Sequence, residues 1–158
     1  MIYSAATLPV NPPGEEPLTR EQLWNGLALK ARDARLFLPP GFCTKCEILH
    51  EGDGFFVRRV TIRDNDLTEI VTFEPTTKIS FHQFKGPREG VIVNEVLEQD
   101  DGSLHLRFYC LLGLKGVDPD GPEEQQEKTR IQSEDQGYRR NVLSTLDRIR
   151  SLVKERKL

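Results

Sequence analysis

The sequence predicts an α+β fold in which a curved antiparallel sheet of seven strands wraps around a long C-terminal helix. Residues 43–112 alternate with a period of two and carry a turn about every 8 to 12 positions, which is typical of an antiparallel meander of six strands. One further strand and a helical segment precede this meander, and a second helical pattern follows it. A sheet of this kind must bury one face, and the last helix is available to cover it.

Length and composition fit one globular domain. The chain has 158 residues, of which 37% are hydrophobic and 30% charged, so we expect residues 1–158 to form a single domain with a proper core. The formal net charge of -3 argues against a nucleic-acid partner, because phosphate binding needs a basic surface. No apolar run reaches the roughly 18 residues of a membrane span, and the N-terminus lacks a secretion signal. We therefore expect a cytoplasmic monomer or weak homodimer without stable membrane insertion.

The first strand and the first helix are separated by a loop. Residues 2–10 alternate weakly and run into Asn-Pro-Pro-Gly at 11–14, which cannot continue a strand or a helix. Thr19 and Gln22 are then spaced as a capping box, so a helix begins at this point. Its apolar residues recur at helical spacing, and Leu-Pro-Pro-Gly at 38–41 ends it.

The meander is divided by five turns, the last of which sets the register. Asp101-Gly102 between two alternating runs is the strongest hairpin signal in the chain. A two-residue loop there pairs Leu97 with Leu106 and Glu95 with Phe108, and it turns Asn94 outward. The other turns are Gly52–Gly54, Asp64–Asp66, Pro75–Thr77 and Gly86–Gly90.

Side chains paired across a hairpin share a face, so the inward side can be followed from strand to strand. This register places Glu47 opposite Arg58 on the outer face. The inward residues predicted to contact a ligand are Cys46, Ile48, His50, Val57, Val71, Phe73, Phe81, Gln83, Val93 and Phe108.

Polar groups among the inward residues indicate a wet cavity. A buried charge costs several kcal/mol unless it is paired and hydrogen-bonded, so a filled core would not retain as many charged and polar side chains as these inward positions carry. Arg59, Glu69 and Glu95 are the candidate catalytic residues. Burial can raise the pKa of a carboxyl until it exchanges protons near neutrality, and a carboxyl beside an arginine can polarise a carbonyl or move a proton. The alternative is structural: Arg59 and Glu69 are near-diagonal across their hairpin and can form a buried ion pair or lie at the rim.

The sequence predicts neither a metal nor a cofactor. Cys43 and Cys46, with His50 beyond, resemble half of a zinc site, but on a strand an offset of three sends the two thiols to opposite faces. Glycine-rich phosphate loops, nucleophile elbows and zinc-protease motifs are missing from the sequence.

After the breaker at 117–122, an apolar stripe at spacings of three and four runs through one long helix to the C-terminus. Acidic residues dominate before Asp135 and basic residues after Arg139, which suits the helix dipole. A basic docking tail is the alternative reading of these charges. The stripe comprises Tyr138, Val142, Thr145, Leu146, Ile149, Leu152 and Val153.

Nearly the whole chain resembles the helix-grip superfamily of the birch pollen allergen, START domains and polyketide cyclases, called SRPBCC. More narrowly it is similar to the AtaL-like branch. The order of several short motifs carries the resemblance: Leu18–Trp24, Gly54–Arg59, Glu69–Val71, Gly90–Asn94, Asp101–Leu104 and Leu146–Arg150.

The resemblance implies a cavity for a small hydrophobic or aromatic molecule between the sheet and the long helix. Some family members are encoded with natural-product pathways, where helix-grip proteins act as cyclases or carriers. Asn94 matches the family pattern yet faces outward in our register, so either its role is structural or the register slips there.

Three functions follow as hypotheses. The first is a protein that binds a small, polyketide-like molecule without chemistry, within secondary-metabolite biosynthesis. The second is a cofactor-free cyclase or isomerase that positions such a ligand and assists proton movement through Arg59 and Glu69, or Glu95. The third, ranked last, is a partner-binding module that docks through the helix 139–158.

Overall fold

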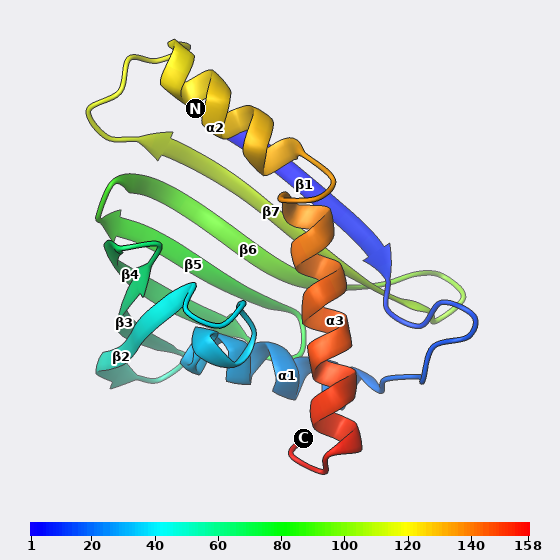
Figure 1. Ribbon diagram of the computed structural model, residues 1–158. Coiled ribbons are helices and arrows are strands. Elements are labelled where there is room, and N and C mark those ends of the chain that lie inside the picture. Colours follow the sequence, from blue (N-terminus) through cyan, green and yellow to red (C-terminus); the bar gives the residue numbers. More distant parts are fainter.

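One antiparallel sheet of seven strands organises the structure, a computed structural model that describes residues 1–158 (Figure 1). The spatial order is β1-β7-β6-β5-β4-β3-β2, so the first strand returns to lie beside the last and the meander runs in sequence from there. The strands are β1 (Ile2–Pro9), β2 (Cys43–Gly52), β3 (Phe55–Ile62), β4 (Asn65–Glu74), β5 (Lys78–Lys85), β6 (Arg88–Glu98) and β7 (Leu104–Leu114).

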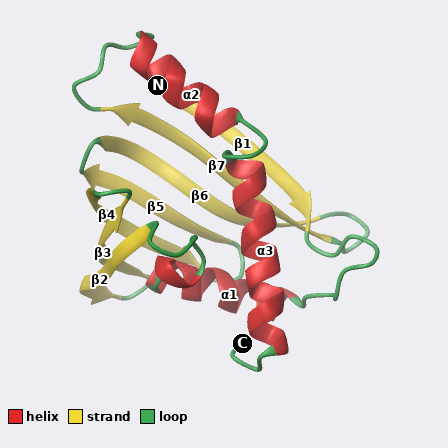
Figure 2. Ribbon diagram, in the orientation of Figure 1, coloured by secondary structure: helices red, strands yellow, loops and turns green.

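The helices gather on one side of this sheet (Figure 2). Helix α3 (Tyr138–Lys154) crosses in front of the strands, α1 (Arg20–Arg32) lies across the same side, and α2 (Pro122–Gln132) runs beside β1. A short 3-10 helix, Ala34–Leu36, follows α1. None of the helices is long and apolar enough to cross a membrane.

The core lies between the inner face of the sheet and these helices. The predicted stripe of α3 is buried from Tyr138 to Leu152, with Val153 only partly covered. Helix α1 approaches α3 closely at Gly26, where a Cβ would lie 2.5 Å from the Ile149 side chain. A larger residue at 26 would therefore push the two helices apart.

The fold class and the first helix are confirmed. The Thr19 hydroxyl accepts from the Gln22 amide and the Gln22 side chain accepts from the Thr19 amide, which is the expected capping box. The long C-terminal helix is confirmed as α3, but it begins only at Tyr138, because the residues after the breaker at 117–122 form the separate helix α2. The chain turns between them at Gly137, where any Cβ would lie 2.2 Å from the Ser133 carbonyl oxygen.

The register of the β6–β7 hairpin differs by one residue from the sequence prediction. The loop has three residues instead of two, Asp100–Gly102, and is closed by the Gln99 amide donating to the Ser103 carbonyl. Gly102 adopts φ 83°, which allows this longer loop. Asn94 rather than Glu95 therefore lies opposite Phe108, and every side chain of β6 changes face.

The β3–β4 hairpin is shifted in the same way. Its two-residue loop is Arg63-Asp64, both with positive φ, one position earlier than the turn expected at 64–66. Arg58 instead of Arg59 consequently pairs with Glu69 on the inner face. Strand β2 adds a bulge after Ile48, which turns His50 outward while Cys46 stays on the inner side.

Candidate functional site

Five polar side chains meet on the inner face of the sheet, and we call them the inner polar cluster. Arg58, Glu69, Gln83 and Asn94 come from four neighbouring strands, β3 to β6, and Lys30 reaches them from the last turn of α1. Arg58, Glu69, Gln83 and Asn94 are each at most 5% exposed. The cluster thus interrupts a face that is otherwise apolar.

One end of the cluster is a buried ion pair. Arg58 Nε donates to Glu69 Oε2 at 2.8 Å, and Gln83 Nε2 donates to Glu69 Oε1 at 2.8 Å. Arg58 Nη1 also donates to the carbonyl oxygen of Ala31 at 2.5 Å, and its guanidinium lies 4.9 Å from the centre of the Phe81 ring. Every charge at this end therefore has a partner, as burial requires.

The other end holds a cation without a counter-charge. Lys30 Nζ donates to Asn94 Oδ1 at 3.0 Å and lies 4.2 Å from the centre of the Phe108 ring, and it makes no ion pair. Burial, together with the nearby Arg58 charge, lowers the pKa of Lys30 from 10.5 to about 7, although the Glu69 charge opposes the change. The amine is therefore poised between its charged and neutral forms near neutral pH.

A buried amide oxygen is also left without a partner. Because Gln83 must offer its NH2 group to the Glu69 carboxylate, its Oε1 points elsewhere, and it has no hydrogen-bond donor. An unsatisfied buried acceptor costs roughly 1–3 kcal/mol. Its cross-strand neighbour is Gly90, which has no side chain to approach it. A hydroxyl or amine of a bound molecule would satisfy this oxygen.

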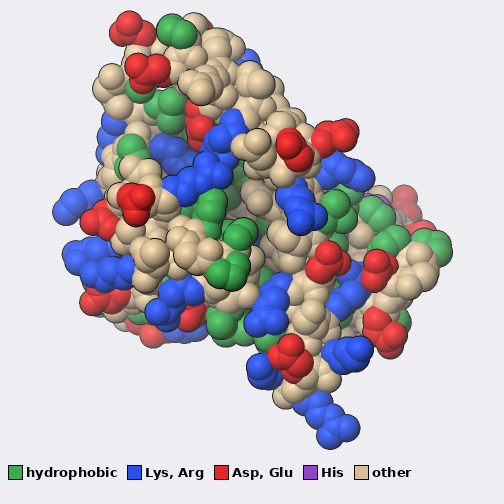
Figure 3. All heavy atoms as spheres, in the orientation of Figure 1, with side chains coloured by type: hydrophobic (Ala, Val, Ile, Leu, Met, Phe, Trp, Pro, Cys, Tyr) green, Lys and Arg blue, Asp and Glu red, His purple; other side chains and the backbone are tan.

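Part of the inner face near the cluster is exposed. Figure 3 shows a hollow on the helix side of the molecule, between α3 and the strands β2 to β4, with Lys and Arg side chains gathered at its rim. Gly90 and Ile92 face inward from the middle of the sheet and yet remain partly exposed, as does Lys30. A ligand can therefore reach the inner face without unfolding it.

Basic side chains gather where the sheet ends near α2. Arg130 Nε donates to Glu127 at 2.8 Å, and Arg88 lies 3.9 Å from the same carboxylate. The bond from Arg130, together with the charges of Arg130, Arg88 and Arg63, lowers the pKa of Glu127 although partial burial opposes this. Three arginines around one carboxylate leave an excess of positive charge at this end of the inner face.

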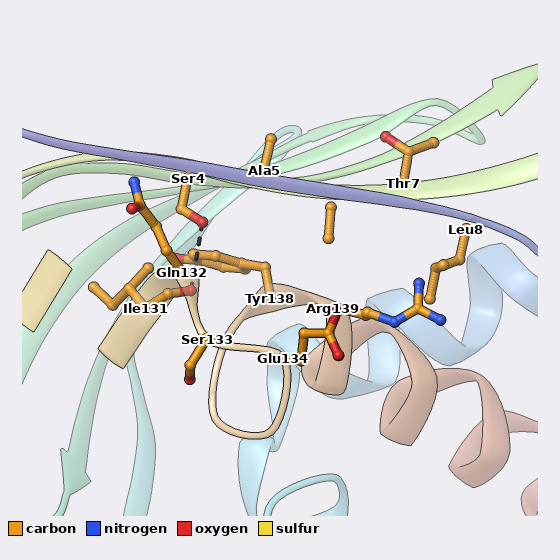
Figure 4. Close-up of a pocket in the computed structure, with 11 residues that line it drawn as sticks. Ser4, Ala5, Thr7, Leu8, Ile131, Gln132, Ser133, Glu134, Tyr138 and Arg139 are labelled. Carbon is orange, nitrogen blue, oxygen red and sulfur yellow. Dashed lines mark hydrogen bonds between the residues drawn. The ribbon is translucent and has the colours of Figure 1, made fainter. Parts of the chain in front are cut away.

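Two of the pockets on the protein lie away from the inner polar cluster. One of about 260 Å³ opens between α1 and the β2–β3 turn, next to Phe56 and Phe73. The other, of about 220 Å³, lies between β1 and the α2–α3 connection, where Ser4 donates to the Ile131 carbonyl (Figure 4). Neither is lined by a residue of the cluster, so we locate the candidate site by its chemistry.

The structure divides the residues singled out from the sequence between the two faces. Glu69 and Gln83 belong to the inner polar cluster, whereas Arg59 and Glu95 lie on the outer face because of the two register shifts. Val93 is buried there against Ser80 and Tyr109. The other inner-face residues are Cys46, Ile48, Val71, Phe73, Phe81 and Phe108; the other outer-face residues are His50 and Val57.

Sequence reasoning missed three members of the cluster. The sequence did point to Asn94, because it matches the family pattern although our register turned it outward. The structure shows that this register was wrong. Arg58 was assigned to the outer face opposite Glu47, which in fact lies opposite Arg59. Lys30 gave no signal, because a lysine in the last turn of a helix is ordinarily a solvated residue that favours the dipole.

Comparison with known families gives one sequence match. The sequence model of AtaL, described as acetylaranotin biosynthesis cluster protein L, matches residues 4–156. No curated protein sequence matches the chain.

Similar solved structures share the fold at low sequence identity. The Zhui aromatase/cyclase from Streptomyces sp. R1128 is 20% identical, with a TM-score of 0.66 over 98% of this chain and 94% of that one. Ara h 8.0201 is 13% identical, with a TM-score of 0.59 over 94% and 97% of the two chains. The di-domain ARO/CYC BexL from the BE-7585A biosynthetic pathway is 14% identical, with a TM-score of 0.61 over 95% of this chain and 49% of that one.

Proposed function

The chain belongs to the AtaL family, and from this premise we propose that it binds a small hydrophobic or aromatic, polyketide-like molecule against the inner face of its sheet, within a natural-product pathway. The observation that carries the proposal is the inner polar cluster on an otherwise apolar face of the sheet that is partly exposed. Ligand pockets are typically apolar surfaces with a few convergent polar groups. Here those groups are an unpartnered amide oxygen on Gln83 and an uncompensated amine on Lys30.

These two groups indicate which functional groups the ligand carries. Gln83 Oε1 accepts from a hydroxyl group, and Lys30 donates to a carbonyl or enolate oxygen. Ile92 and the rings of Phe81 and Phe108 lie next to them and suit an apolar or aromatic body. We therefore expect a molecule that combines an aromatic body with hydroxyl and carbonyl oxygens.

The first experiment is native mass spectrometry of the protein purified from its own host, followed by organic extraction. A bound aromatic or polyketide-like molecule would support the proposal and name the ligand class. An empty protein that also fails to bind the fluorescent probe anilinonaphthalene sulfonate would contradict it.

A matched pair of variants locates the site. Ile92→Trp fills the hollow from the inner face of β6, whereas Val91→Trp adds the same ring to the outer face one residue away. We expect the first to weaken probe binding at least tenfold and the second to leave it unchanged, with circular dichroism verifying that both are folded. Equal binding by the two variants would place the ligand elsewhere.

A second candidate function is a cofactor-free cyclase or isomerase, which the low pKa of Lys30 favours. A general base works best when its pKa lies near the operating pH, and the neutral Lys30 amine can accept a proton from a carbon next to a ligand carbonyl. Glu69 is committed to Arg58 and Gln83, so in this scheme it positions its neighbours.

The enzyme hypothesis has a distinct kinetic signature. Turnover should rise with pH through about 7 as the Lys30 amine loses its proton, and Lys30→Met should abolish turnover while ligand binding persists. Glu95→Gln on the outer face is the control and should not change the rate. A Lys30→Met protein with full turnover would leave only the binding function.

A further inference from the structure

Lys30 is chemically unlike the other amines of the chain. It alone lies in the inner polar cluster, where Arg58 and Glu69 are the charged groups that face it and Asn94 is its only hydrogen-bond partner. The Glu69 charge acts on Lys30 only from a distance, and it is already balanced by the Arg58 guanidinium that it binds. Removal from water and a neighbouring cation both favour the uncharged amine.

These conditions also make a lysine nucleophilic. Lysines that form imines are activated by an apolar setting or by a second cationic group, and Lys30 has both. The hydrogen bond to Asn94 Oδ1 and the Phe108 ring 4.2 Å away hold the amine in place. The side chain is partly exposed, which leaves it accessible to small molecules.

We propose that Lys30 forms an imine with the carbonyl carbon of an apolar or aromatic ketone or aldehyde bound in the hollow. This inference rests on the proposed ligand site and adds a covalent step to it. The amine nitrogen bonds to the carbonyl carbon, the carbonyl oxygen leaves as water, and the two amine hydrogens depart with that water. The reaction consumes no oxidant or reductant, and water reverses it.

Reductive trapping tests the proposal. The intact protein is incubated at pH 7 with naphthaldehyde and sodium cyanoborohydride, which reduces an imine to a stable secondary amine, and peptide mapping then locates the adduct. Among the lysines we expect one dominant adduct, on Lys30, because the fraction of free amine is roughly a thousandfold larger there than on an ordinary lysine at this pH. Adducts spread over the exposed lysines, with none on Lys30, would overturn it, whereas labelling of the N-terminal amine is expected in either case.

Two variants make the assignment specific. Lys30→Arg keeps the charge and the reach but cannot form an imine, so the dominant adduct should disappear. Lys115→Arg is the control, since Lys115 donates to the Phe84 carbonyl on the exposed side of the protein, and its adduct pattern should match that of the wild type. Retention of the dominant adduct by Lys30→Arg would also overturn the proposal.

Failure of this inference can be told apart from failure of the ligand site. Binding of naphthalene, which has no carbonyl, is measured in parallel by fluorescence. Naphthalene binding that is lost in Ile92→Trp, without any adduct on Lys30, would contradict the imine and leave the ligand site standing. An absence of both binding and adduct would contradict the two together.

Discussion

Two cations lie in the inner polar cluster, and only one of them has a counter-charge. Arg58 and Lys30 each lie over a phenylalanine ring, Phe81 and Phe108 respectively. Arg58 is bound to the Glu69 carboxylate at 2.8 Å, whereas Lys30 is bound to a neutral amide. The difference is the Glu69 carboxylate, which binds Arg58 and leaves Lys30 without a negatively charged partner.

This difference separates a structural role from a chemical one. An arginine stays protonated and presents a rigid fork, so a buried arginine must be paired. A lysine without a partner can instead release its proton, which makes burial tolerable and leaves a reactive amine. The cluster therefore has a stabilising end at Arg58 and a reactive end at Lys30.

The largest effect on stability is expected from removing the carboxylate that pairs with Arg58. Glu69→Gln leaves Arg58 as an uncompensated buried charge, so the free energy of unfolding should fall by about 3–5 kcal/mol. Urea denaturation at neutral pH measures this. Glu95→Gln is the control, because Glu95 lies 3.9 Å from Arg107 on the outer face and a pair of this kind contributes about 1 kcal/mol or less. A loss for Glu69→Gln that is no larger than for the control would refute the distinction.

The unpaired end should show itself in the pH dependence of stability. Since the pKa of Lys30 is lowered in the folded state, the unfolded chain binds more protons between pH 7 and 10.5, and stability rises with pH across that window. The contribution of Lys30 to this slope is at most about 1.4 kcal/mol per pH unit. Lys30→Met should remove it, which urea titrations at several pH values can measure. An unchanged slope would mean that Lys30 stays charged in the fold.

The smallest effect is expected from giving Lys30 a counter-charge, as Arg58 already has. Asn94→Asp places a carboxylate beside Lys30, raises the pKa of the amine and should reduce naphthaldehyde labelling at pH 7 by about tenfold, equivalent to about 1.4 kcal/mol. Asn94→Leu is the matched variant: it removes the hydrogen bond without adding charge, so Lys30 should remain labelled. Equal labelling of the two variants would show that charge does not control the amine.

The inner polar cluster could be predicted only in part. Glu69 and Gln83 were placed correctly because the β4–β5 hairpin kept the inward side that the sequence indicates. Arg58 and Asn94 were misplaced because each hairpin loop differs by one residue in length or position from the loop assumed. A shift of one residue exchanges the two faces of a strand. A small error in a turn therefore predicts Arg59 on the inner face, where the structure has Arg58.

Local patterns alone predict the elements of this protein and their order. The capping box at Thr19, the alternation within the meander and the apolar stripe of α3 depend on residues close together in the chain, and the structure contains all three. The tertiary structure decided which of two adjacent residues faces inward on β3 and β6, and it brought Lys30 to Asn94, 64 positions away in the sequence. Those outcomes depend on loop geometry and on how α1 packs against the sheet, so they cannot be predicted from the periodicity of any single segment.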